Sequence, residues 1–142
     1  MAQRKPCQIM AIKEESVTEQ KNSLAVCLDN ILRHAGITRN TEYDLAQGKT
    51  ATTILSENMT GVQVLDLSGC TLDAVLYYVN QDIPVLAILE DGEAVLVTGF
   101  NEFNVVIMEP ATGKLYKKGM NDATAWFAEN GNHFITYMRT EN

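Results

Sequence analysis

The first strong pattern in the chain is a helical repeat of apolar residues that begins near Ser23. Apolar side chains recur there at steps of three and four residues, which is the spacing of one face of an α-helix. Asn22 or Ser23 can cap the first free amides, and Gly36 stands where a helix commonly ends in a left-handed turn. The sequence therefore predicts an amphipathic helix whose apolar face contains Leu24, Cys27, Leu28, Ile31, Leu32 and Ala35.

The residues before this helix are mostly polar. Only residues 7–12 (CQIMAI) are apolar enough for a strand, so residues 1–22 are expected to form an N-terminal arm or an edge strand. After the helix, residues 41–59 predict one or two short helices broken at Gly48, and residues 62–67 predict a short strand.

The second half of the chain predicts one further helix and then a sheet built from hairpins. Residues 71–81 carry apolar positions at helical spacing, and Pro84 prevents a continuation. Asp91 and Gly92 form a dipeptide typical of tight hairpin turns between two apolar runs. The predicted strands are residues 85–89, 94–100, 105–108, 115–117 and 134–138, with a helix capped by Asn121 and ending at Gly131 before the last strand. Helices followed by antiparallel strands predict a single α+β domain over residues 1–142.

Composition narrows the possible partners. The 142 residues are 46% hydrophobic, enough to bury a core, and 11 Lys and Arg against 18 Asp and Glu give a formal charge of -7. This charge opposes binding to nucleic acid and to anionic membranes. No apolar run reaches the roughly 20 residues that span a bilayer, and residues 1–30 lack the layout of a signal peptide. We therefore expect a cytoplasmic protein or an extracytoplasmic piece of a longer one.

The three cysteines, Cys7, Cys27 and Cys70, are an odd number at wide spacing, which predicts neither a disulfide framework nor a zinc site. Cys27 lies on the apolar face of the first helix and is expected in the core. Cys70 directly precedes a predicted helix, whose free amides can lower the pKa of a thiol. A thiol nucleophile also needs a base, and the sequence assigns none.

Two other groups of residues have ordinary explanations. Gly48, Lys49 and Thr50 spell the end of a phosphate-binding loop, but Tyr43 stands where that loop needs a glycine. His34 lies in the last turn of the first helix, and His133 leads into the last strand. Nothing in the sequence brings further ligands toward either histidine, so we expect no metal and no cofactor.

Four pieces of the chain, in this order, resemble a known family. They are the helix from Ser23 to Gly36, LDAVLYYVNQDIPVLAIL, GEAVLVTGF and VVIMEPATGK. Together they look like the bacteriocin-processing, papain-like cysteine peptidases that cleave after double-glycine leaders, which form peptidase family thirty-nine. The likeness covers roughly residues 20–118. It implies a papain-like fold with N-terminal helices and an antiparallel sheet, a bacterial source, and a peptide or protein segment as partner.

The family's catalytic positions carry different residues in this chain. Its nucleophilic cysteine opens the first helix thirteen residues before the closing glycine, and Ser23 takes that position here. Glu93 stands at the position of the histidine, and Glu109 precedes Pro110 where the family has its orienting aspartate. Gln20 is the candidate for the oxyanion-hole glutamine. The resemblance thus implies a site without its thiol and without its imidazole.

These replacements favour a domain that has lost catalysis. A serine hydroxyl needs a neighbouring base, and Glu93, with a reference pKa of about 4.3, is a weak one. The first hypothesis is a catalytically degenerate domain that binds peptide in a vestigial cleft. The second is an active thiol hydrolase that uses Cys70, or Cys27 if the alignment slips by four residues. The third is a passive structural module of a larger bacterial protein.

Overall fold

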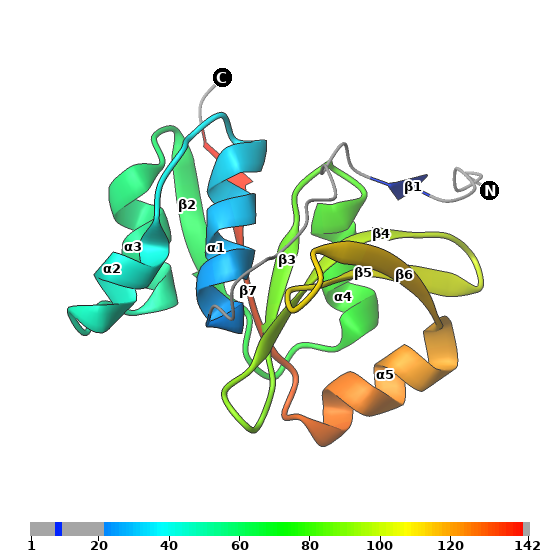
Figure 1. Cartoon of the computed structure of the whole chain (residues 1–142). Helices are drawn as coiled ribbons and strands as arrows, with labels where there is room; N and C mark the ends of the chain where they lie inside the picture. Colours follow the sequence, from blue (N-terminus) through cyan, green and yellow to red (C-terminus); the bar gives the residue numbers. More distant parts are fainter. Residues whose placement is uncertain (1–7, 10–21, 141–142) are drawn as a thin grey trace.

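The structure, a computed structural model, describes residues 8–9 and 22–140 and has the predicted α+β architecture (Figure 1). Three helices precede most of the sheet, and two more lie between strands. The helices are α1 Ser23–His34, α2 Thr41–Ala46, α3 Ala51–Asn58, α4 Leu72–Val79 and α5 Met120–Glu129. The strands are β1 Gln8–Ile9, β2 Val62–Asp66, β3 Val85–Ile88, β4 Ala94–Phe100, β5 Asn104–Glu109, β6 Lys114–Gly119 and β7 His133–Arg139.

The described strands form one antiparallel sheet in the order β2-β7-β3-β4-β5-β6, with β1 added beside the end of β4. Strands β3 to β6 follow one another as a meander, and Asp91 and Gly92 lie in the turn between β3 and β4 as the dipeptide predicts. Strand β7 does not extend the meander. It returns to pair with both β2 and β3, which places the last strand inside the sheet, next to the edge strand β2.

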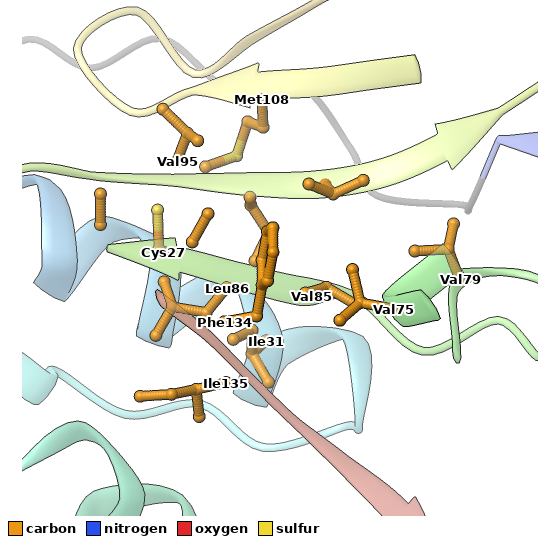
Figure 2. Packing of buried hydrophobic residues seen from close by; sticks show 14 of the residues in the cluster. Cys27, Ile31, Val75, Val79, Val85, Leu86, Val95, Met108, Phe134 and Ile135 are labelled. Atoms are coloured by element: carbon orange, nitrogen blue, oxygen red, sulfur yellow. The ribbon is translucent and has the colours of Figure 1, made fainter. Parts of the chain in front are cut away.

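Helices cover both faces of the central strands. All seven residues of β4 are buried, so both of its faces must be covered. Both α1 and α4 contact β4, and Figure 1 shows α1 in front of the sheet and α4 on its other side. The α5 residue Phe127 packs against Phe134 of β7, with ring centroids 5.3 Å apart. The core therefore has two layers around the sheet, and Figure 2 shows part of it.

The ends of α1 follow the predicted capping chemistry. The Asn22 side chain accepts hydrogen bonds from the amides of Leu24 and Ala25, at 2.8 and 3.4 Å. At the other end Gly36 has φ +86, a conformation that glycine adopts without the clash a Cβ would cause. Asn22 rather than Ser23 is the cap, which leaves the Ser23 hydroxyl available for another contact.

The predicted cap of the last helix is wrong. α5 begins at Met120, one residue before Asn121, and its N-cap Gly119 is also the last residue of β6. The amide of Met120 donates to the carbonyl of Phe103 at 2.7 Å. Pairing with the neighbouring chain segment therefore sets the start of this helix, and no side-chain cap is formed.

A polar network holds α2 against α1. Thr41 is buried, and both its amide and its hydroxyl donate to one carboxylate oxygen of Asp29, at 2.8 and 2.7 Å. Asp44 is buried one turn later and accepts two hydrogen bonds from the Arg39 guanidinium, at 2.9 and 2.7 Å. The hydrogen bond from Arg39 holds the pKa of the Asp44 carboxyl below its usual value.

The Arg39–Asp44 pair predicts a loss of stability in acid. Because the folded-state pKa of Asp44 is lowered, its contribution is present above the unfolded value of about 3.9 and disappears as the pH falls through the folded value. We expect the wild type to exceed Asp44→Asn in free energy of unfolding at about pH 7, with the difference shrinking at about pH 3. Urea unfolding at both pH values measures this. A difference that is independent of pH would contradict the assignment to Asp44.

Candidate functional site

Ser23, which the family resemblance predicts at the nucleophile's position, lies in a buried contact between α1 and β4. It is the first residue of α1, and only 7% of its surface is exposed. Its Oγ accepts a hydrogen bond of 2.9 Å from the main-chain amide of Ala94. The start of the first helix and the start of β4 therefore lie side by side, although 71 residues separate these two positions in sequence.

The end of the ladder between β4 and β5 explains why the Ala94 amide needs Ser23. The β4 residue Leu96 pairs with Met108, and the described pairing of these two strands stops there. Ala94 lies two residues farther and is buried, so its amide cannot rely on water. The Ser23 hydroxyl supplies the acceptor. The observed role of this side chain is thus to satisfy a buried backbone donor.

Glu93 immediately precedes Ala94, and its side chain is exposed at the β3–β4 turn. Its amide donates to the Asp91 side chain at 2.9 Å, and its carbonyl accepts from Leu89 at 2.7 Å. Glu109 ends β5 opposite Lys114 and is also exposed. In the described part of the chain, no side-chain hydrogen bond joins either glutamate to Ser23. Gln20 lies outside the described residues.

The two described thiols lie in different environments. Cys27 is completely buried in the core, as its place on the apolar face of α1 predicts, and burial raises the pKa of its thiol (Figure 2). Cys70 is half-buried and packs against the edge of the core. Its amide donates to the Leu67 carbonyl, while the next residue, Thr71, caps α4. Cys7 lies outside the described residues.

The other candidate residues have structural partners. The Nε2 atom of His34 lies 3.1 Å from the carbonyl of Asp82, and His133 begins β7 opposite Ile88. Lys49 pairs with Glu57 at 2.6 Å. Within residues 8–9 and 22–140, no three His, Cys, Asp or Glu side chains gather as a metal site would need.

Two surface hollows lie away from Ser23. One, of about 220 Å³, is bordered by Tyr77 of α4 and Phe100 of β4. The other, of about 390 Å³, lies at the far end of α1 and is bordered by His34, Tyr137 and Arg139. Neither Tyr137 nor Arg139 is a candidate by sequence, because both belong to an ordinary strand pattern and neither forms a local motif. None of the described helices is long and apolar enough to cross a membrane.

Comparison with solved structures identifies the fold of this chain, whereas the sequence comparisons find no match. The structure superposes on the crystal structure of a candidate C39-like peptidase from Bacillus anthracis with a TM-score of 0.75. The match covers 94% of this chain and 98% of that one, at 12% sequence identity. No family model and no curated protein sequence matches the chain. The chain thus has the papain-like fold of C39-like peptidases, as the ordered motifs imply.

The contact between Ser23 and Ala94 predicts a measurable contribution to stability. Ser23→Ala removes the acceptor and leaves a buried amide without a partner, which typically costs about 1–3 kcal/mol. Ser56→Ala, at an exposed serine of α3, is the matched control and should change the free energy of unfolding by less than about 0.5 kcal/mol. Chemical denaturation measures both. Equal effects of the two substitutions would show that the Ser23 hydrogen bond contributes no stability.

The burial of Cys27 predicts that only unfolding exposes it to reagents. In a Cys7→Ser background, we expect an aromatic disulfide reagent to label Cys70 in the native protein and Cys27 only in denaturant. Cys70→Ser and Cys27→Ala, made separately, assign the two labelling phases. Labelling of Cys70 much faster in the native protein than in denaturant would reveal an activated thiol and favour the hydrolase hypothesis.

Proposed function

We propose that this chain is a catalytically degenerate peptidase-like domain that binds a peptide or protein segment without cleaving it. The observation that carries the proposal is the hydrogen bond from the Ala94 amide to the Ser23 hydroxyl. It supports the alignment by which Ser23 replaces the nucleophilic cysteine beside the strand that begins after Glu93. It also gives the serine a structural role that needs no catalysis.

Among the described residues, no group around Ser23 supplies what acyl transfer needs. A serine nucleophile requires a base that accepts its proton, usually an imidazole that a third group orients. Glu93 is an exposed carboxylate, and its side chain forms no hydrogen bond within the described residues. His34 is at the opposite end of α1, which spans 12 residues, or about 18 Å at roughly 1.5 Å per residue. His133 is two strands away from Ala94, because both residues pair with Ile88 of the strand between them.

Peptide binding does not depend on the missing groups. An extended segment can be held by main-chain hydrogen bonds and side-chain pockets, neither of which needs a nucleophile. The fold shared with a candidate C39-like peptidase supports this choice of ligand. The formal charge of -7 favours segments that are neutral or basic. The bound segment would pass the start of α1 and the β3–β4 turn, where Ser23 and Glu93 lie.

The test is a titration with a fluorescein-labelled peptide that carries a double-glycine leader. We expect saturable binding by fluorescence anisotropy and an intact peptide by mass spectrometry after prolonged incubation. Glu93→Lys, beside Ser23, should weaken binding at least about fivefold, the effect of one unfavourable charge in an interface. Glu102→Lys, an exposed charge reversal at the β4–β5 turn, is the control and should leave the affinity unchanged.

Three outcomes would overturn the proposal. Cleavage that disappears in Cys70→Ser would establish a thiol hydrolase. The absence of saturable binding to this peptide and to a pool of unrelated basic peptides would favour a passive structural module. Equal affinities for Glu93→Lys and Glu102→Lys would show that the peptide binds elsewhere on the domain.

A further inference from the structure

The hollow of about 390 Å³ at the carboxyl-terminal end of α1 is separate from the proposed peptide site. Its walls come from the last turn of α1, the segment between α3 and β2, and the end of β7. Ser23 lies at the other end of the same helix, about 18 Å away at roughly 1.5 Å per residue. The volume falls at the small end of the range of about 300–1,000 Å³ that is common for small-molecule sites.

Tyr137 presents an unused hydrogen-bond donor to this hollow. Its side chain is 98% buried, since only 2% of its surface is exposed, and it borders the hollow. It lies two residues beyond Ile135 on β7 and therefore on the same face of the sheet. No buried side-chain nitrogen or oxygen of the described residues lacks a hydrogen-bond partner, and no described residue bonds the Tyr137 hydroxyl, so this hydroxyl is open to the solvent of the hollow. Burial raises the pKa of Tyr137, so the group stays protonated and can donate. A tyrosine hydroxyl that opens into a hollow can donate to a bound acceptor in place of water.

Two basic side chains, Arg139 and His34, border the same opening. Arg139, two residues after Tyr137, donates from Nη1 to the Gln81 carbonyl at 3.3 Å, which keeps its guanidinium at the rim. His34 donates from Nε2 to the Asp82 carbonyl, and the Asp82 carboxylate lies 3.4 Å from the same nitrogen. Asp82 is an acidic neighbour of His34, and its side chain is 59% exposed. In a protein with a charge of -7, a tyrosine donor beside an arginine is a local site for an anion.

The remaining wall is apolar. Ile37, Met59 and Val62 border the hollow, and all three also pack against the core. A bare inorganic anion would leave this wall without a partner, whereas a short hydrocarbon chain would bury against it. We propose that this hollow binds a small organic acid, with its carboxylate on Tyr137 and Arg139 and its hydrocarbon body against the apolar wall.

The test is an NMR titration of the full chain with butyrate, butyramide and inorganic phosphate. We expect saturable shifts with butyrate, centred on backbone amides of the hollow such as Gly61. Butyramide lacks the charge and phosphate lacks the hydrocarbon body, so each should bind about tenfold more weakly or less. Tyr137→Phe and Arg139→Gln should each weaken butyrate binding about tenfold, the effect of losing a hydrogen bond to a charged group.

Matched controls separate binding from folding. Tyr116→Phe is the control for Tyr137→Phe, and Lys114→Gln, which also removes a positive charge, is the control for Arg139→Gln. Both lie on β6, far from the hollow, and should leave butyrate binding unchanged. Tyr137→Phe removes a hydroxyl that bonds no described residue, so the melting temperature should not fall. The proposal is overturned if butyrate causes no saturable shifts, if butyramide or phosphate matches it, or if Tyr137→Phe and Arg139→Gln bind it like the wild type. Failure here leaves peptide binding near Ser23 unaffected.

Discussion

The constraint on which the structure depends is the two-sided burial of β4. A strand whose seven residues are all buried needs apolar cover on each face, and its backbone groups need partners without help from water. Helix α1 covers one face and α4 the other, and β3 and β5 satisfy most of its backbone. Where β5 ends, one amide remains, and a hydroxyl from α1 accepts its hydrogen bond.

The same constraint explains how the fold sets the positions of Ser23 and Ala94 independently of the chemistry of the site. Packing α1 on β4 brings the first residue of the helix to the first residue of the strand, whatever side chain stands there. In a cysteine peptidase of this fold, that approach is what brings a thiol near its base. Here it brings a serine near a backbone amide. Because Ala94 is buried, its amide needs the acceptor that the serine supplies. Packing can thus maintain a fold whatever chemistry its site carries.

The two ends of α1 have different physical characters. At its start, a buried hydroxyl is already engaged and the nearby Glu93 is exposed. At its end, the Tyr137 hydroxyl opens into a hollow rimmed by Arg139 and His34. The first end is the proposed peptide site, whereas the second has the donors of the proposed organic-acid site. The family resemblance therefore points to the start of α1, whereas the side-chain chemistry of the hollow points to its end.

Local patterns in the sequence determined most of the elements and the class of the fold. The apolar spacing of α1, the breaks at Gly48 and Pro84, and the Asp91–Gly92 turn are each decided by residues near in sequence, so the chain alone reveals them. The family resemblance likewise rested on the order of such pieces, and the shared fold agrees with it. The burial of Cys27 followed from its place on the helical face.

Long-range pairing was decided only by the tertiary structure. The return of β7 between β2 and β3 depends on contacts between residues far apart in sequence, and hydrophobic alternation is the same wherever a strand inserts. The start of α5 depended on the Phe103 carbonyl rather than on Asn121. The partner of the Ser23 hydroxyl and the place of Tyr137 beside the hollow also became visible only in the folded chain. A sequence records which groups can form hydrogen bonds, but folding decides which of them meet.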